Sequence, residues 1–300
     1  MKHLKKYVSL ILSVLLLTSL LAACGQKESG SNSAASSEST GAAASSGSVE
    51  NPKDVQAIID RGVLRVGVKN AVIGFGYQDP LTQEYTGLEI TLAKKIAEHF
   101  GVEVEFTAVT AATRTELLDS GDIDCVLATF TITDERKKSW DFSTPYYTDY
   151  VTVLVENSSG IKGLNDLADK KVGVSSGSTS AKALVKAMIE GGVISGDGFS
   201  EDTFDPATWT KGVSFHQYDD YPTISTALSA GEINAFCVDK SILAAYQTDK
   251  RSYIADKFSP QNYGVATKKD SGLTPVVEEL IKGWLSDGTI SGLITENKLQ

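Results

Sequence analysis

Short apolar runs alternate with helix-like segments along most of the chain. Three of these runs are predicted as strands, at residues 64–68, 102–106 and 123–128. Between the first two, one segment places its apolar residues on a single helix face, namely Leu92, Ala93, Ile96, Ala97 and Phe100. Helices are also predicted at residues 113–118 and after Thr274, an N-cap that would precede Pro275 at the first helical position. This alternation predicts an α/β fold with mostly parallel sheets flanked by helices.

Two stretches of the chain repeat one another. Val66-Gly67-Val68 recurs as Val172-Gly173-Val174, and residues 118–124 (LDSGDID) recur as residues 228–234 (LSAGEIN). The two offsets are 106 and 110 residues, so the copies keep their order and nearly their spacing. We therefore expect two α/β lobes of similar design, with a ligand cleft where the carboxyl ends of their strands face each other.

The first 55 residues are predicted to lie outside both lobes. A basic start followed by an apolar run over residues 8–21 is typical of a secretory signal, since the run is too short to span a bilayer. Leu21-Ala22-Ala23-Cys24 resembles the bacterial lipobox, which implies a signal peptide of residues 1–23 and a lipid anchor on Cys24. An ordinary secretory signal is the alternative. Residues 24–55, rich in Ser, Gly and Ala, are predicted to be a flexible linker between the cell membrane and an extracellular or periplasmic domain.

Charge and cysteine usage exclude several classes of function. The formal net charge is −10, and loss of the three Lys in residues 1–23 makes it −13, which argues against nucleic acid as a partner. His99 and His216 show no metal-ligand spacing, so neither a metal nor a cofactor is expected. Cys125 and Cys237 lie in apolar, strand-like runs and are predicted to be buried free thiols without a disulfide.

One motif admits a catalytic interpretation. Residues 173–177 match G-x-S-x-G between a predicted strand and a predicted helix, as in Ser hydrolases, and His216 is the only His downstream. The alternative is a carboxylate-binding site, because Ser178 and Thr179 would open a helix whose free N–H groups and hydroxyls face the cleft. We favour this second interpretation.

A longer set of motifs resembles a known family. Residues 131–138 (TITDERKK) and 141–147 (DFSTPYY) are similar to the signature of polar amino acid ABC-transporter solute-binding proteins, as are, in order, residues 64–68, 87–90, 172–179 and 263–264. The resemblance extends over residues 60–300. It implies a two-lobed periplasmic-binding-protein-like fold of type II, with hinge crossings near residues 147–151 and 259–263. Lobe I would comprise residues 56–148 plus 262–300, and lobe II residues 149–261.

The resemblance also implies a set of ligand-binding residues, which are Thr129, Thr131, Arg136, Ser178, Thr179 and Asp239. Arg136 would hold the α-carboxylate of an amino acid, because its planar fork can do so bidentately. The Thr131 hydroxyl and the N–H groups of Thr129 and Thr131 would assist it. Asp239 would pair with the ligand's ammonium, since an Asp at the end of an apolar strand is otherwise costly to bury.

Two further cations indicate an acidic ligand. Lys69 follows the first strand and Arg114 opens the short helix, where the aspartate/glutamate-binding branch of the family carries matching cations. Lys69, Arg114 and Arg136 against Asp239 give the site a net charge of +2, and each charged group of a dicarboxylic amino acid then finds a partner. Glutamine would leave one cation poorly paired, at a cost of roughly 1–3 kcal/mol. Glutamate or aspartate is the expected ligand, and glutamine is the alternative.

The implied function is binding without chemistry. A monomer would capture the amino acid between its lobes and deliver it to an ABC permease and its ATPase. A dehydratase-like enzyme on the same scaffold is the competing interpretation, but its candidate acids, Glu89 and Asp124, are interpreted as surface or turn residues. Residues 191–212 resemble an insertion, expected to be a surface loop from which Trp209 could instead reach the cleft.

Overall fold

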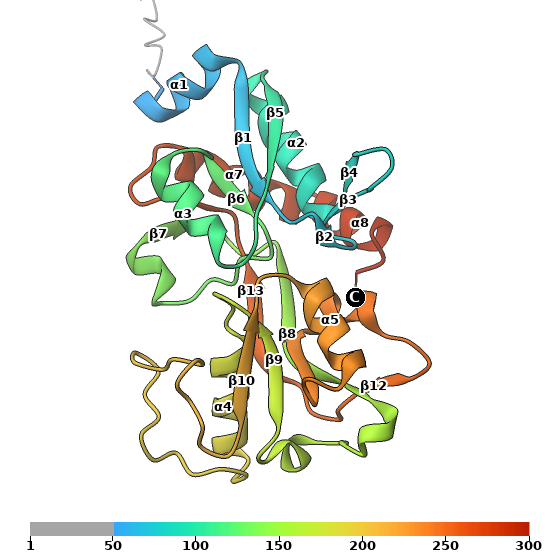
Figure 1. Ribbon diagram of the computed structural model, residues 1–300. Coiled ribbons are helices and arrows are strands. Elements are labelled where there is room, and N and C mark those ends of the chain that lie inside the picture. The colour runs from blue at the N-terminus through green and yellow to red at the C-terminus, as the bar shows by residue number, and fades with distance from the viewer. Residues whose placement is uncertain (1–50, 300) are drawn as a thin grey trace, which may run out of the picture. The chain divides into compact units, whose positions relative to one another are not determined.

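The computed structural model describes residues 51–299, which form helices packed on β-sheets (Figure 1). The α-helices are α1 (Lys53–Arg61), α2 (Leu88–Phe100), α3 (Thr113–Ser120), α4 (Ser180–Glu190), α5 (Tyr221–Ala230), α6 (Lys240–Leu243), α7 (Leu273–Ser286) and α8 (Thr289–Glu296). Short 3-10 helices are η1 (Arg136–Lys138), η2 (Asn157–Ser159), η3 (Leu164–Leu167) and η4 (Ala244–Tyr246). None of the helices in this part of the chain has the length and apolar character needed to cross a membrane. The predicted signal peptide, Cys24 and most of the predicted linker lie outside the described residues.

The strands form one large sheet in each lobe and a small antiparallel sheet, β2-β3-β4, beside α2. In order along the chain they are β1 (Val63–Val68), β2 (Ala71–Val72), β3 (Gly76–Gln78), β4 (Tyr85–Thr86), β5 (Glu103–Ala108), β6 (Cys125–Leu127), β7 (Trp140–Phe142), β8 (Tyr147–Glu156), β9 (Lys171–Ser175), β10 (Ser214–Tyr218), β11 (Ala235–Asp239), β12 (Arg251–Tyr253), β13 (Phe258–Tyr263) and β14 (Ala266–Lys268). Cys125 and Cys237 are both buried, as predicted, and they lie in different sheets.

The expected mostly parallel sheets are confirmed, since in each large sheet a single strand runs against all the others. In lobe I the order is β5-β1-β6-β14-β7, with β1 parallel to its neighbours and β14 antiparallel to both of its own. In lobe II the order is β10-β9-β11-β8-β12, with β9 parallel to its neighbours and β8 antiparallel to both of its own. The chain passes from lobe I to lobe II along β8 and re-enters lobe I just before β14. Each of these two strands runs antiparallel to its neighbours in the sheet.

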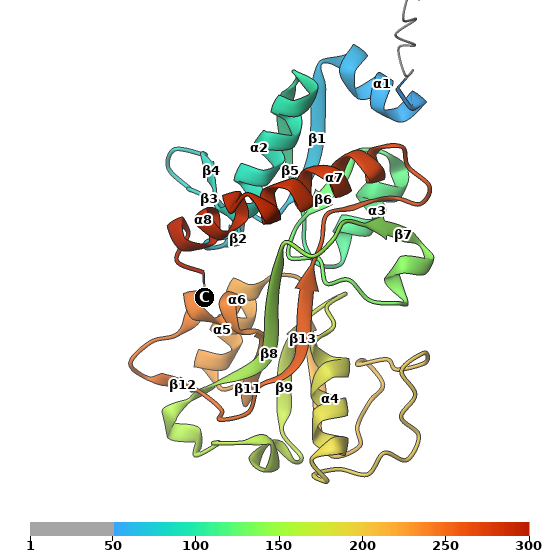
Figure 2. The same cartoon turned by 180° about the vertical axis from the view of Figure 1, so that it is seen from behind.

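The hinge consists of β8 and β13. β13 also pairs antiparallel with β8, so that Tyr263 lies opposite Tyr147 and Gln261 opposite Asp149. Figures 1 and 2 show these two strands side by side in the middle of the described structure, seen from opposite sides. The predicted α/β fold with two lobes and two hinge crossings is confirmed. Below, lobe I means residues 51–148 and 262–299, and lobe II means residues 149–261.

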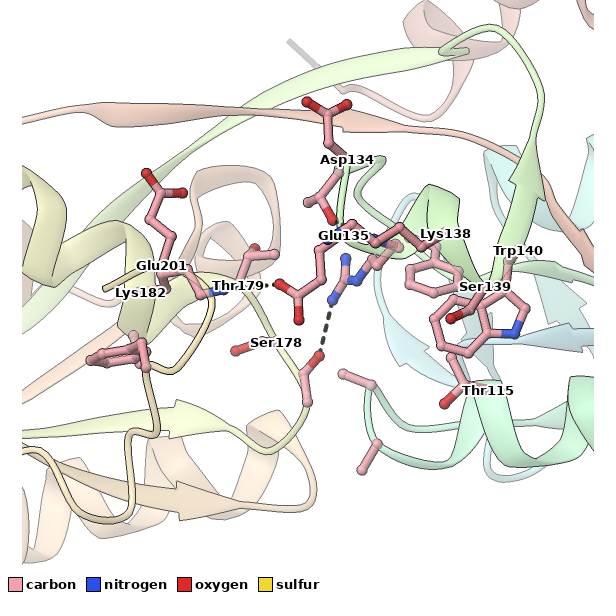
Figure 3. A pocket seen from close by; sticks show the side chains of 18 of the residues that line it. Thr115, Asp134, Glu135, Lys138, Ser139, Trp140, Ser178, Thr179, Lys182 and Glu201 are labelled. Carbon is pink, nitrogen blue, oxygen red and sulfur yellow. Dashed lines mark hydrogen bonds and ion pairs between the residues drawn. The ribbon is translucent and has the colours of Figure 1, made fainter. Parts of the chain in front are cut away.

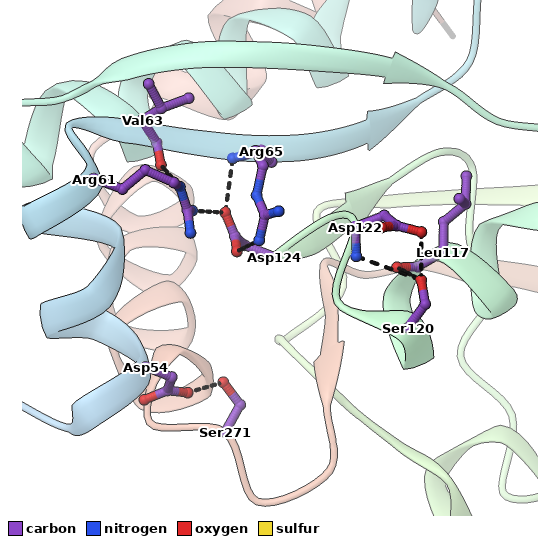
Figure 4. Close-up of polar contacts among 9 residues, drawn as sticks. All are labelled: Asp54, Arg61, Val63, Arg65, Leu117, Ser120, Asp122, Asp124 and Ser271. Carbon is purple, nitrogen blue, oxygen red and sulfur yellow. Dashed lines mark hydrogen bonds and ion pairs between the residues drawn. The ribbon is translucent and has the colours of Figure 1, made fainter.

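The repeat found in the sequence corresponds to the same side-chain-to-backbone hydrogen bond in both lobes. In lobe I the Asp124 carboxylate accepts the backbone N–H of Arg65 at 2.8 Å; in lobe II the Asn234 amide oxygen accepts that of Lys171 at 2.9 Å. Asp124 also pairs with the guanidinium groups of Arg61 and Arg65, at 2.5 and 2.9 Å (Figure 4). Asp124 is thus a structural turn residue, as predicted, which ties a helix-to-strand turn to the first strand of its lobe.

The glycines of the repeat are required by close packing. A Cβ on Gly67 would lie 2.6 Å from Cδ1 of Ile123, and one on Gly173 would lie 2.4 Å from Cδ1 of Ile233. Both isoleucines belong to the repeated motif that follows the helix, so each lobe packs the same side chain onto the same strand position. A larger residue at either position would require these buried isoleucine side chains to shift.

One predicted helix start was wrong by two residues. α7 begins at Leu273, so Thr274 lies inside its first turn and does not cap it. The Thr274 hydroxyl instead hydrogen-bonds with the hydroxyl of Thr267 on β14, at 2.6 Å. This contact ties the helix to the sheet of lobe I.

The insertion at residues 191–212 packs on lobe II through an aromatic cluster. Trp209 is 9% exposed and contacts Phe199 and Phe204, with ring centroids 5.9 and 5.6 Å away. Its Nε1 donates to the carbonyl oxygen of Lys211 at 3.1 Å. Trp209 is therefore a core residue of lobe II, and the alternative in which it reaches the cleft is wrong.

Candidate functional site

Residues from both lobes surround a small cavity at the carboxyl ends of the strands. The lining residues are Ala111, Arg114, Thr129, Thr131, Arg136, Ser178, Thr179, Ser180, Tyr221, Val238 and Asp239. Every predicted binding residue except Lys69 is among them. The Lys69 ammonium lies next to the lining, with Nζ 5.6 Å from the ring centroid of Tyr221.

Arg136 bridges the lobes. Its Nη1 donates to the carbonyl oxygen of Thr131 in lobe I at 2.7 Å, and its Nη2 to that of Gly177 in lobe II at 3.0 Å. Burial, followed by repulsion from Arg114, lowers the pKa of Arg136 to about 9. Both guanidinium groups pack on the ring of Phe130, with Cζ 3.9 Å from its centroid for Arg114 and 4.7 Å for Arg136. Phe130 thus offsets part of their repulsion through cation–π contacts, a role that the sequence analysis missed.

Arg114 carries a buried donor without an acceptor, and the ammonium of Lys69 makes no hydrogen bond to a described residue. Arg114 is 3% exposed, and its Nη1 donates to the carbonyl oxygen of Ala128 at 2.8 Å, but no described residue accepts from its buried Nε. Lys69 is 5% exposed, and Nζ makes no hydrogen bond within residues 51–299. Burial and the charge of Arg114 hold the pKa of Lys69 well below its usual range. Both cations would therefore gain from an anion in the cavity.

Glu89 is a buried member of this site, so its interpretation as a surface residue was wrong. Its Oε1 accepts the N–H of Thr129 at 2.6 Å and the hydroxyl of Tyr146 at 2.5 Å, while Oε2 is buried without a partner among the described residues. Burial raises the pKa of Glu89 to about 7. The bond also corrects the assignment of the Thr129 N–H, because that donor is already used and cannot bind a ligand as predicted.

Asp239 is the last residue of β11, and it lines the cavity. It is 5% exposed and accepts a hydrogen bond from the hydroxyl of Tyr263 in the hinge. Burial and the neighbouring carboxylate of Asp149 raise its pKa to about 7, against the opposing effects of Tyr263 and of Arg114. An ammonium group placed beside Asp239 would favour its ionised form, as the predicted role requires.

The lobe II side of the cavity includes the start of α4. Thr179 is the N-cap of this helix, so the first N–H groups of the helix have no intrahelical acceptor. The Ser178 hydroxyl is buried and has no partner in the described structure. These donors suit a carboxylate. The hydrolase interpretation has no support here, because Ser175 is buried while His216 is exposed and stacks on Tyr218.

A wider pocket, the mouth, opens beside the cavity and shares Ala111, Arg136, Ser178 and Thr179 with it. Across the mouth, Lys182 of α4 pairs with Glu135 of lobe I at 3.0 Å (Figure 3). The insertion contributes to the far wall of the mouth through Glu201, Asp202, Phe204 and Pro206. The lobes therefore contact each other beside the cavity, as in a closed form.

Tyr221 was also missed by the sequence analysis. It opens α5, after the N-cap Asp220, whose side chain accepts the N–H of Thr223 at 2.7 Å. Tyr221 belongs to lobe II, is 6% exposed and meets Lys69 of lobe I. An aromatic residue at the start of a helix that follows a sheet strand was the available signal.

Cations and acids thus converge between two lobes that are joined by paired hinge strands, an arrangement that suits a small zwitterion. Within residues 51–299 no group of His, Cys, Asp and Glu could hold a metal ion. The chain belongs to the bacterial extracellular solute-binding proteins, family 3, which it matches over residues 64–297. The family resemblance found in the sequence is confirmed.

Individual relatives are similar over most of the chain. The ABC transporter glutamine-binding protein GlnH of Bacillus subtilis (strain 168) is 34% identical over 292 residues, which cover 95% of this chain and 94% of GlnH. The L-cystine-binding protein TcyJ of Escherichia coli (strain K12) is 32% identical over 240 residues, covering 78% of this chain and 82% of TcyJ. The structure of an ancestral arginine-binding protein bound to glutamine matches with a TM-score of 0.65 and 32% identity, covering 79% of this chain and 97% of that one.

Proposed function

We propose that this chain is the substrate-binding subunit of an amino acid ABC importer and that its substrate is a dicarboxylic amino acid, glutamate or aspartate. The names of the relatives support the general role, since GlnH is named for an ABC transporter and for glutamine, and TcyJ for cystine. In this role the lobes close on the ligand, and a permease with its ATPase receives it. The protein acts as a monomer and performs no chemistry on the ligand.

The observation that carries the acidic substrate is that neither the buried Nε of Arg114 nor the ammonium of Lys69 has a hydrogen-bond acceptor within residues 51–299. Arg136 already faces the cavity as the partner for an α-carboxylate, and Asp239 as the partner for an ammonium. A second carboxylate on the ligand would meet the unpaired Lys69 ammonium and the free edge of Arg114. A neutral amide in its place would leave these cations without a counter-charge.

The charge balance of the site supports the same substrate. Lys69, Arg114 and Arg136 face the buried acids Asp239 and Glu89, so the net charge is +1 and not the +2 expected before Glu89 was placed in the site. A dicarboxylic amino acid of net charge −1 neutralises this set. Asp149 is also buried, but it acts on Asp239 from the hinge side and accepts hydrogen bonds from Tyr150 and Ser241.

Localisation follows from the proposed role. A lipid on Cys24 and a linker over residues 24–55 would hold the binding lobes near their permease at the outer face of the membrane. Labelling of cells with a radioactive fatty acid should mark the protein, and Cys24→Ser should abolish the label. Secretion of unlabelled wild-type protein would instead support an ordinary signal peptide.

Calorimetric titration with the common amino acids tests the substrate. Glutamate or aspartate should bind most tightly, and Lys69→Met should weaken their binding by about tenfold or more while changing glutamine binding less. Lys94→Met, on the exposed face of α2, is the matched control. Tight binding of glutamine or arginine without binding of glutamate and aspartate would overturn the proposal.

Glutamine is the alternative substrate, because a relative that matches over 95% of this chain is named for it. A dehydratase-like activity is the other alternative, and the raised pKa of Glu89 provides its candidate acid. However, the Glu89 carboxylate accepts its two hydrogen bonds from Thr129 and Tyr146, so it stabilises the cavity wall instead of contacting a substrate. Product formation from an incubated amino acid or prephenate-type acid would establish the enzyme and contradict a pure binding role.

A further inference from the structure

Gln261 touches both lobes from within the hinge. It lies in β13, is 2% exposed, and lies opposite Asp149 in the pairing with β8. Its Oε1 accepts the hydroxyl of Thr131 in lobe I at 2.8 Å and the hydroxyl of Thr179 in lobe II at 2.7 Å. One buried carbonyl oxygen therefore joins two cavity-lining residues of opposite lobes.

The orientation of the Gln261 amide follows from its other side. Nε2 donates to the carbonyl oxygen of Ser259 at 3.0 Å and contacts its hydroxyl oxygen at 3.2 Å. A backbone carbonyl is only an acceptor, so the amide nitrogen must face it and the amide oxygen must face the two threonines. Ser259 presents its carbonyl group there because it has a φ of 50° at an irregularity in the pairing of β13 with β8, just before Pro260.

The direction of these bonds determines what the threonines can offer a ligand. A hydroxyl has one proton, and both protons are donated to Gln261. Towards the cavity, Thr131 and Thr179 therefore present only oxygen lone pairs. This revises the expectation that the Thr131 hydroxyl helps Arg136 to bind a carboxylate. Backbone N–H groups would do so instead. The N–H of Thr131 is one candidate, because it has no acceptor within residues 51–299.

We propose that Gln261 is a positioning residue that couples the two lobes and fixes the threonine hydroxyls as acceptors when the cleft is closed. The inference rests on the proposed function, because it assumes that an amino acid occupies the cavity. In the open form the two hydroxyls would separate, so that Gln261 could hold only one of them. Closure therefore gains a hydrogen bond at the hinge in addition to those made by the ligand.

The test is a double-mutant cycle measured by calorimetric titration with the wild-type ligand. Gln261→Met keeps the side-chain length but removes both polar atoms, and it should weaken ligand binding about tenfold. Thr131→Val should also weaken binding in the wild-type background, but by much less in the Gln261→Met background, since the hydroxyl has already lost its fixed direction. Gln261→Glu should retain more affinity than Gln261→Met, because a protonated carboxyl can donate to Ser259 and accept from both threonines.

Asn262→Met is the matched control. Asn262 is the next hinge residue, and its side chain makes one hydrogen bond to a described residue, which it accepts from the hydroxyl of Thr148 on β8 at 2.8 Å. This variant should keep wild-type affinity, and the melting temperatures of all ligand-free variants should show that they fold. Additive effects of Gln261→Met and Thr131→Val, or full affinity in Gln261→Met, would overturn the role of Gln261. A wild-type protein that binds no amino acid would instead overturn the proposed function.

Discussion

The Glu89 carboxylate accepts the backbone N–H of Thr129 at 2.6 Å, and Thr129 adopts a φ of 45°. A β-branched residue rarely occupies this left-handed region, and such strain costs of order 1–3 kcal/mol. Thr129 follows β6 at the cavity wall, so the strain lies at the ligand site. Glu89 stabilises the strained backbone and so links the first turn of α2 to the wall that Arg114 and Arg136 share.

This strain predicts that Gly at position 129 is more stable than Ala, the reverse of the usual order in a strand. Thr129→Gly should be more stable than Thr129→Ala by about 1 kcal/mol, because only Gly adopts a positive φ without strain. Urea unfolding of the two variants measures the difference. At an ordinary strand position Ala would be the more stable residue, so that order at position 129 would contradict the strain.

Glu89 and Asp239 should make the stability of the ligand-free protein depend on pH. Burial raises the pKa of both carboxyls to about 7, from ordinary values of 4.5 and 3.8. A carboxyl whose pKa is raised on folding binds more protons in the folded chain, so its stabilising contribution is largest in acid and is lost as the pH rises through about 7. The Tm should therefore fall between about pH 4 and about pH 7, where the folded chain binds more protons than the unfolded chain.

Two variants on α2 test the source of this pH dependence. Glu89→Gln should flatten the slope of Tm against pH, since it removes one of the titrating groups. Glu98→Gln, on the exposed face of the same helix, should leave the slope unchanged. Equal slopes in wild type and Glu89→Gln would exclude Glu89 as a contributor.

Much of the architecture was predictable from local patterns. The apolar stripe of α2 and the paired motifs that end at Asp124 and Asn234 require buried strands and two similar lobes. Arg136 and Asp239 were assigned to one ligand site from the family resemblance, and both line the cavity in the structure. The hinge strands were found from the family resemblance and not from periodicity.

What the sequence analysis missed depends on contacts between distant segments. Glu89 precedes Leu92 and Ala93 by three and four residues, so helical spacing places it on the buried face, but its charge favoured a surface interpretation. Its partners Thr129 and Tyr146 are 40 and 57 residues away along the chain. The role of Gln261 likewise depends on lobe closure, which no local pattern encodes.

Asp239→Asn should separate stability from function. It removes a buried carboxylate that faces Asp149, so the ligand-free protein should gain stability near pH 8, where the carboxylate is ionised. It also removes the counter-charge of the ligand's ammonium, and binding should weaken by at least about thirtyfold. Thermal unfolding and calorimetric titration measure the two effects, and unchanged affinity would exclude Asp239 from the ligand site.

The two lobe-to-lobe contacts of neighbouring residues 135 and 136 should differ strongly in effect. Arg136→Lys loses the planar fork that reaches both Thr131 and Gly177, and binding should weaken about tenfold or more. Glu135→Gln breaks only the solvent-exposed pair with Lys182, whose partners are 63% and 28% exposed, so the loss should be less than about fivefold. Comparable losses of affinity in the two variants would indicate that contacts at the mouth, rather than those at the cavity, stabilise the closed form.

Trp209 should matter for folding and not for binding. Its ring is 9% exposed within the aromatic cluster of the insertion, and its Nε1 is already bonded to Lys211. Trp209→Ala would leave a large cavity there and should lower the free energy of unfolding by about 3–5 kcal/mol. Thr208→Ala, at the exposed neighbouring position, is the control and should change little. At a temperature where both variants are folded, ligand affinity should equal that of the wild type, because Trp209 lines neither the cavity nor the mouth. A loss of affinity without a loss of stability would place the Trp209 ring in the cleft.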